Sequence, residues 1–283
     1  MIFKETMMEN EIQEYKKLID FNVNNFKAES RIRMSNSGLI PFLTVFFSVI
    51  AQIILTYAFF PWEEYNEISR IVLEGGTIDI KSFPWIKYSL LLLILFIVKP
   101  ILDAPCRYLS SLLCKTSGPV KFSDYTRGFS FSTKSLLLAF WKLLWYFLWS
   151  FLSLIPGIIF IIVASVISSK TGWGSIENIR NIAFIILNLG FWLVYSIKYY
   201  SYSQAEYAII DDERVGVLSS LKISKKITKG HKFQLFYLDL TYFIWIIAGI
   251  FIPVVRIFIL PYYRITKYLA YRTLLENYSN SKK

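Results

Sequence analysis

An uncharged run, LIPFLTVFFSVIAQIILTYAFF (Leu39–Phe60), restricts what this chain can fold into more than any other feature. At about 1.5 Å per residue, a helix of this length reaches about 33 Å, which is enough to cross the hydrocarbon core of a bilayer. Apolar residues make up 55% of the 283 residues and charged residues only 18%, below the roughly 25% of soluble domains. The sequence therefore predicts one membrane-embedded domain and argues against a soluble fold.

Five further segments are predicted to cross the membrane, which gives an all-α integral membrane bundle of about six spans with amphipathic interfacial helices. The predicted segments are Phe83–Leu102, Leu143–Val166, Ile179 to about Ser201, Phe233 to about Phe251, and about Val254 to Tyr271. Pro100 and Pro105 are expected to break the second helix as the chain leaves the bilayer. Because Arg256, Arg264 and Lys267 interrupt the last segment, a re-entrant hairpin stays open as an alternative there.

The apolar run from Ser135 to Ser168 is too long for one upright span. We divide it at Lys142 into an interfacial helix and the third span. Pro156 and Gly157 lie within that span, where they should kink the helix and form a candidate hinge.

Residues 1–37 form an N-terminal cytoplasmic or interfacial segment, 38–276 the membrane domain, and 277–283 a polar tail. Helical spacing predicts an amphipathic helix in the first segment, with Ile12, Tyr15, Ile19, Val23 and Phe26 on one face.

A second amphipathic helix is predicted within residues 214–232, with Gly230 as its C-cap. Its apolar arc consists of Val217, Leu221, Ile223 and Ile227, and Ser220, Ser224 and Thr228 share this arc. Lys222, Lys225, Lys226 and Lys229 fall on the opposite side. These lysines form a basic rim that is expected to face the anionic headgroups of the lipid bilayer.

Charge predicts the topology, because lysines and arginines gather in short cytoplasmic loops. Residues 103–134 and 214–232 are the most basic segments, and they share one side if the third and fourth spans form a hairpin. The acidic loop 61–82 is then outside and both termini are cytoplasmic. The basic ends Lys282 and Lys283 agree with this arrangement. The basic charge is thus attributed to lipid contact, and no nucleic-acid partner is expected.

Asp239 is predicted to be the most informative polar residue, because it lies about 9 Å inside the fifth span. Arg264 or Lys267 of the sixth span could pair with it at similar depth. The alternatives are a path for an ion or substrate and an exposed interfacial acid. Glu206 belongs to the same candidate intramembrane polar site, as a solvated or capping residue or at the inner mouth of the bundle.

Several short motifs resemble a bacterial family of multi-pass membrane proteins, the domain of unknown function 975. They are SLIPGII (Ser153–Ile159), YSQAEY (Tyr202–Tyr207), KGHKFQLF (Lys229–Phe236), LDL (Leu238–Leu240), LPYYRIT (Leu260–Thr266) and PILDAPCRYL (Pro100–Leu109). About forty residues separate IPGII from YSQAEY, whereas these motifs nearly adjoin in many relatives. The family is distantly similar to membrane domains attached to glycerophosphodiester phosphodiesterases. The resemblance implies an integral membrane fold without an established activity, cofactor or catalytic residue.

No residue cluster predicts a catalytic, cofactor or metal site. Cys106 and Cys114 form no CxxC motif, and the chain has one histidine. We therefore expect a non-enzymatic protein of the bacterial plasma membrane, accessory to transport, peptide export or bacteriocin-type immunity, whose partner is a membrane protein or a peptide. The alternatives are a transporter or channel with Asp239 in its path and, more weakly, a lipid-modifying enzyme.

Overall fold

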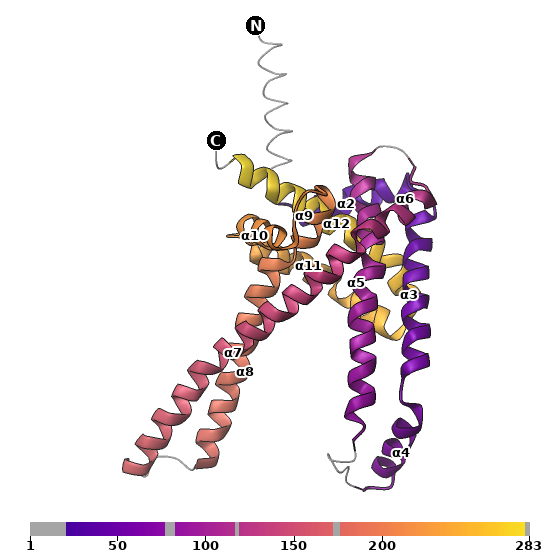
Figure 1. Cartoon of the computed structure of the whole chain (residues 1–283). Helices are drawn as coiled ribbons and strands as arrows, with labels where there is room; N and C mark the ends of the chain where they lie inside the picture. Colours follow the sequence, from indigo (N-terminus) through magenta and orange to yellow (C-terminus); the bar gives the residue numbers. More distant parts are fainter. Residues whose placement is uncertain (1–20, 77–82, 117–118, 172–175, 281–283) are drawn as a thin grey trace. The chain divides into compact units, whose positions relative to one another are not determined.

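The computed structural model describes residues 21–76, 83–116, 119–171 and 176–280, and in these ranges it consists of helices and their connections (Figure 1). The helices are α2 (Val23–Ser35), α3 (Ile40–Phe59), α4 (Trp62–Leu73), α5 (Trp85–Lys115), α6 (Phe122–Arg127), the 3-10 helix η1 (Gly128–Phe131), α7 (Ser132–Thr171), α8 (Ile176–Tyr202), α9 (Ala205–Asp211), α10 (Val217–Ile227), α11 (Lys232–Phe251) and α12 (Pro253–Asn280). The predicted all-α fold is confirmed.

Four of the described helical segments are long and apolar enough to cross a membrane. They are Ile40–Phe59, Trp85–Lys115, Phe122–Val166 and Lys232–Phe251. The apolar segments are therefore compatible with a membrane location. The predicted fourth and sixth spans correspond to α8 and α12, which are helical, and the count of six crossings stays a prediction.

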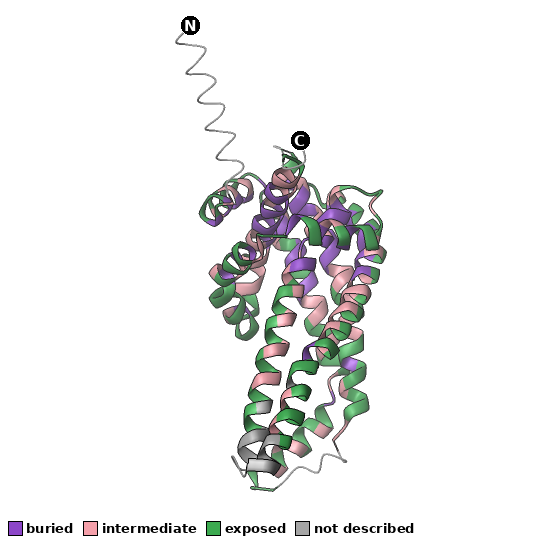
Figure 2. Cartoon of the chain, turned by 90° about the vertical axis from the view of Figure 1, so that its left-hand side faces the viewer, coloured by how far each residue is buried: buried purple, intermediate pink, exposed green. Residues whose placement is uncertain are grey.

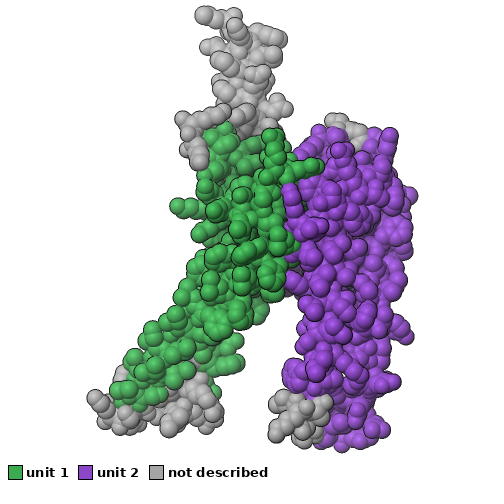
Figure 3. Space-filling view, viewed as in Figure 1, with its two compact units in different colours: residues 1–23, 137–241, 269–283 green, residues 24–136, 242–268 purple. Residues whose placement is uncertain are grey.

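The chain divides into two compact units, which Figure 3 shows in green and purple. Unit 1 consists of Met1–Val23, Leu137–Thr241 and Leu269–Lys283, and unit 2 of Asn24–Leu136 and Tyr242–Tyr268. In unit 2, α3 and α5 pack side by side, and α6 and η1 pack on α5. The helices of unit 1 include most of α7, all of α8 to α10 and the first half of α11.

Burial in α5 follows the pattern of a helix that is half in lipid. Most of its apolar first half is exposed, including Ile86, Leu90, Leu92 and Leu93. Its second half carries Asp103, two prolines and two serines, yet it holds most of the buried residues of the helix. In Figure 2 the exposed and intermediate colours likewise cover most of the long stems of the helices. A lipid solvent explains this inverted order, because apolar side chains are stable there and polar ones are not.

The prediction that Pro100 and Pro105 break the second helix is wrong, because α5 continues through both prolines to Lys115. A proline at position 105 has no N–H and leaves the carbonyl of Ile101, four residues earlier, without its helical donor. The Ser132 hydroxyl donates a hydrogen bond of 3.0 Å to this carbonyl. A donor from another element thus stabilises the helix where its own ladder is interrupted.

The division at Lys142 is also wrong. One continuous helix, α7, runs from Ser132 to Thr171 and includes the predicted interfacial helix and the third span. The charge of Lys142 is balanced within unit 1, because its ammonium donates a 3.0 Å hydrogen bond to the carboxylate of Glu206. A lysine at this position therefore does not require the helix to end. Pro156 and Gly157, the candidate hinge, lie inside the same continuous helix.

The acidic loop 61–82 contains a helix that we did not predict. Glu63 and Glu64 lie in the first turn of α4, where acids interact favourably with the positive end of the helix dipole. Glu64 also forms an ion pair with Lys87 at the start of α5. Residues 77–82 of this loop lie outside the described residues.

Only the last part of the predicted N-terminal amphipathic helix lies within the described residues. Ile12, Tyr15 and Ile19 lie outside the described residues, as do Lys282 and Lys283. Val23 and Phe26 are both buried, as their predicted place on the apolar face requires. At the other end of α2, the Arg33 guanidinium donates hydrogen bonds to the carbonyls of Leu113 (2.9 Å) and Cys114 (3.0 Å). These bonds satisfy carbonyls at the C-terminus of α5 that have no donor within the helix.

Candidate functional site

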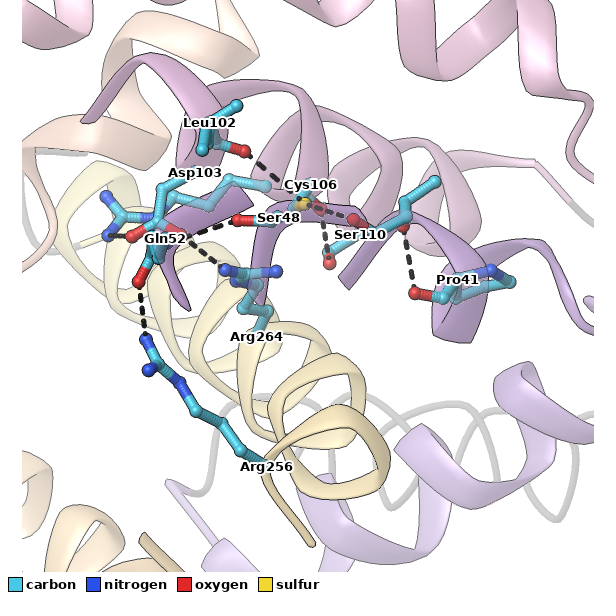
Figure 4. Close-up of polar contacts among 11 residues, drawn as sticks. Pro41, Ser48, Gln52, Leu102, Asp103, Cys106, Ser110, Arg256 and Arg264 are labelled. Atoms are coloured by element: carbon cyan, nitrogen blue, oxygen red, sulfur yellow. Dashed lines mark hydrogen bonds and ion pairs between the residues drawn. The ribbon is translucent and has the colours of Figure 1, made fainter. Parts of the chain in front are cut away.

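A buried carboxylate between two guanidinium groups forms the centre of the polar network in unit 2 (Figure 4). Arg264 of α12 donates a 2.6 Å hydrogen bond to one oxygen of Asp103 on α5. Arg107, one turn further along α5, lies 3.6 Å from the other oxygen. The Asp103 and Arg264 side chains are only 12% and 7% exposed. Such a pair stabilises the contact between two helices, and removing one partner leaves an uncompensated buried charge.

The network continues toward α3 through a neutral carboxamide. Gln52 accepts a 3.1 Å hydrogen bond from Nη2 of Arg256, which lies in the first turns of α12. The amide nitrogen of Gln52 donates to the hydroxyl of Ser48 at 3.3 Å. The orientation of the carboxamide is thereby fixed, so its oxygen faces the guanidinium (Figure 4).

Cys106 of unit 2 has a packing role in this region. Cys106 is buried one turn from Asp103, and its thiol lies 3.7 Å from the carbonyl of Thr44 on α3. Cys106 packs with Val45, Val49 and Tyr125 in an apolar cluster. Neither Cys106 nor Cys114 takes part in a disulfide within the described part of the chain.

Glu206 in unit 1 forms an ion pair with Lys142, so it differs from a solvated residue, one of the alternatives given for it. Its carboxylate accepts the hydrogen bond from Lys142, and the two side chains are 20% and 13% exposed. This ion pair joins the short helix α9 to α7. Glu206 therefore helps to hold the end of the predicted third span.

The carboxylate of Asp239 accepts a hydrogen bond from the hydroxyl of Tyr200. Asp239 and Tyr200 belong to unit 1, whereas Arg264 and Lys267 belong to unit 2. Arg264 binds Asp103 within its own unit, and the buried ammonium of Lys267 lies 5.5 Å from the ring centroid of Tyr263. The pairing of Asp239 with Arg264 or Lys267 stays a prediction.

The predicted surface helix is present as α10, and its lysines form the exposed side. Leu221 and Ile227 are buried, whereas Lys222, Lys225, Lys226 and Lys229 are exposed. Gly230 has a φ of +86°, the left-handed conformation expected of a C-cap glycine.

The small polar residues on the buried arc of α10 make specific contacts. The Ser224 hydroxyl donates to the carbonyl of Ser201 at 2.8 Å and accepts from the backbone N–H of Gln204 at 3.2 Å. Thr228 is fully buried and donates to the carbonyl of Ser224 at 2.8 Å. These residues therefore attach α10 to the end of α8 and do not weaken its buried face.

Sequence reasoning missed Asp103, although a signal for it was present. Leu102, Cys106, Leu109 and Leu113 recur at helical spacing across the two prolines, which indicates that the helix continues there. An acid within such a helix, with Arg107 one turn later, is a candidate for an intramembrane ion pair. Gln52 gave no comparable signal, because a single glutamine does not identify its partner.

The described arrangement is suited to holding helices together by charge and hydrogen bonds. Among the described residues, no three histidine, cysteine or carboxylate side chains are grouped so that they could hold a metal ion.

The sequence profile of a family described as "Protein of unknown function (DUF975)" matches residues 24–278. No curated protein and no solved structure shows significant similarity to the chain.

Proposed function

Because the chain belongs to the DUF975 family of proteins of unknown function, we propose a role from its surface chemistry. The protein is a non-enzymatic multi-pass protein of the bacterial plasma membrane that acts as an accessory to transport, peptide export or bacteriocin-type immunity. It acts by binding another membrane protein through α8. Both termini are cytoplasmic, and Lys222, Lys225, Lys226 and Lys229 face anionic headgroups, each contributing about 1 kcal/mol to membrane attraction.

The observation that carries this proposal is an exposed carboxamide on α8. Asn188 is exposed, and Phe184, Ile185, Leu189 and Trp192 around it on the same face are between 56% and 67% exposed. Its amide nitrogen donates to the carbonyl of Phe184 at 2.7 Å, within the same helix. The carboxamide oxygen is available to a group outside the chain.

The depth of Asn188 makes a protein partner a better occupant than lipid. It lies twelve residues after Ile176, the first residue of α8, which is about 18 Å along the helix and near its middle. Lipid tails cannot donate a hydrogen bond to a carboxamide. A polar side chain that binds across two transmembrane helices contributes about 1–2 kcal/mol in model peptides. A helix with a hydroxyl or amide donor at this depth is the partner that fits.

Photo-crosslinking in intact bacterial membranes tests the proposal. A photoreactive residue in place of Leu189 should form an adduct with a transport or export protein or with a peptide. The Asn188→Leu substitution should reduce this adduct about five- to thirtyfold, which corresponds to about 1–2 kcal/mol. The same photoreactive residue at Ile54 of α3, which is 60% exposed, is the control and should give no adduct that depends on Asn188. Adducts only with lipid or a second copy, or an adduct unchanged by Asn188→Leu, would contradict the proposal.

A transporter or channel is the second candidate, and the contact between Asp239 and Tyr200 favours it. An acid seven residues into α11 that binds a tyrosine hydroxyl is the kind of group found along proton and ion paths. If it lines such a path, the Asp239→Cys variant should react with a water-soluble thiol reagent, and a cysteine in place of the lipid-exposed Ile244 should not. Equal resistance of both variants would remove the basis of this candidate.

A further inference from the structure

Arg256, in the first turns of α12, is a half-buried cation whose hydrogen-bond acceptor is neutral. Both oxygens of Asp103 are engaged, one by Arg264 at 2.6 Å and one by Arg107 at 3.6 Å. Among the described residues no carboxylate lies within 4.0 Å of Arg256, whose hydrogen-bond acceptor is the neutral oxygen of Gln52. We infer that Arg256 and Gln52 form a binding site for an oxyanion, a carboxylate or phosphate group, and this site is separate from the proposed α8 surface.

The site lies at membrane depth. Gln52 is twelve residues after Ile40, the first residue of α3, or about 18 Å along a predicted span. The turn between α11 and α12 is apolar and exposed, with Phe251 80%, Ile252 55% and Val254 58% exposed. An apolar turn of this kind is compatible with hydrocarbon, and Arg256 follows it by less than one helical turn.

Close packing holds Arg256 in place beside this turn. A Cβ atom added at Gly249 of α11 would lie 3.0 Å from Cβ of Arg256 and 3.2 Å from its Cα. The backbones of the two helices therefore approach closely at this point, and only a glycine fits there without displacement. The side chain of Arg256 is half-buried, so part of it remains open to a ligand.

The chemistry of this pair selects an oxyanion. A guanidinium presents five N–H donors in a planar fork that matches the two oxygens of a carboxylate or phosphate, and Gln52 accepts from Nη2. Gln52 is a neutral partner, so the positive charge of Arg256 keeps a preference for an anion. The positive end of the α12 dipole lies at the same turn and acts in the same direction.

Binding of two probes distinguishes the sources of this anion. Labelled inorganic phosphate is titrated onto the full-length protein in nanodiscs of neutral phosphatidylcholine, and retention of phosphatidylglycerol is measured by native mass spectrometry without added phosphate. Saturable phosphate binding identifies a free oxyanion, retention of phosphatidylglycerol identifies a lipid headgroup, and either result supports the site. In both assays Arg256→Gln should weaken binding at least tenfold, and Arg256→Lys should weaken it less because it keeps the charge.

Arg214→Gln is the matched control, because the Arg214 side chain is 95% exposed, and it should bind both probes as the unmodified chain does. Gel filtration of each variant verifies that it is folded. Arg256→Lys, which keeps the charge, provides the comparison if Arg256→Gln does not fold. The inference is overturned if the unmodified chain binds neither probe, or if the folded Arg256 variants bind them unchanged.

Discussion

Replacing Asp103 with asparagine should lower the free energy of unfolding by about 3–5 kcal/mol, the range for breaking a buried ion pair from one side. Asparagine keeps the size of the side chain but removes the negative charge that faces Arg264 and Arg107. Because the Arg264 side chain is only 7% exposed, water has little access to hydrate its charge once the carboxylate is removed. The loss should appear as a lower SDS midpoint when the protein is titrated from mild detergent into SDS.

Two comparisons make this expectation specific. Glu67→Gln removes a carboxylate of an exposed residue of α4 and should change the midpoint by less than a tenth of the Asp103 effect. The double variant Asp103→Leu with Arg264→Met removes both charges, so it should be more stable than Asp103→Asn alone. If Asp103→Asn unfolds at the same SDS concentration as Glu67→Gln, the pair does not stabilise the contact between α5 and α12.

The uncharged runs made much of the fold predictable from sequence. The predicted span Leu39–Phe60 differs from α3 by one residue at each end, and Ile179–Ser201 and Phe233–Phe251 agree closely with α8 and α11. The reason is physical, because a chain in hydrocarbon must satisfy its backbone internally and a helix does so locally. Local sequence is then sufficient to identify the element.

The errors arose where a residue depends on a partner far away in the sequence. Lys142 resembles a break in an apolar run until Glu206, 64 residues later, is known to accept a hydrogen bond from its ammonium. Pro105 likewise resembles a helix end until Ser132 is known to bind the free carbonyl of Ile101. Neither partner can be inferred from helical periodicity, which describes only neighbours along one helix.

The candidate site shows the same limit. Asp239 attracted attention because it stands alone in an apolar run, whereas Asp103 was grouped with the basic segment that follows it. The two residues joined by the shortest ion pair of this network, Asp103 and Arg264, are 161 positions apart. Arg264 was selected as a buried cation of the last predicted span, but its partner Asp103 in unit 2 required the packing of α5 against α12 to be known.

Gly128 should be one of the positions most sensitive to a single added methyl group. It is the first residue of η1, and a Cβ there would lie 2.5 Å from Cα of Pro105 and 2.9 Å from its Cβ. Its φ of −62° is an ordinary helical value, so an alanine would be strained by this contact and not by its own backbone. Since both atoms belong to a proline in the middle of α5, neither can move away as the end of a flexible side chain would.

Gly128→Ala should therefore separate η1 from α5, at a cost of about 1–3 kcal/mol for overpacking. Ser132 lies four residues after Gly128, so the substitution should also lengthen the 3.0 Å hydrogen bond from the Ser132 hydroxyl to the carbonyl of Ile101. Gly190→Ala is the matched control, because the nearest atom to its added Cβ is 3.6 Å away, an ordinary contact within a helix, and it should not lower the SDS midpoint. A further variant, Gly128→Ala with Ser132→Ala, should lose little more than Gly128→Ala alone, because the added methyl group already displaces the hydroxyl. Full additivity of the two substitutions would show that η1 does not hold the proline segment of α5 through this bond.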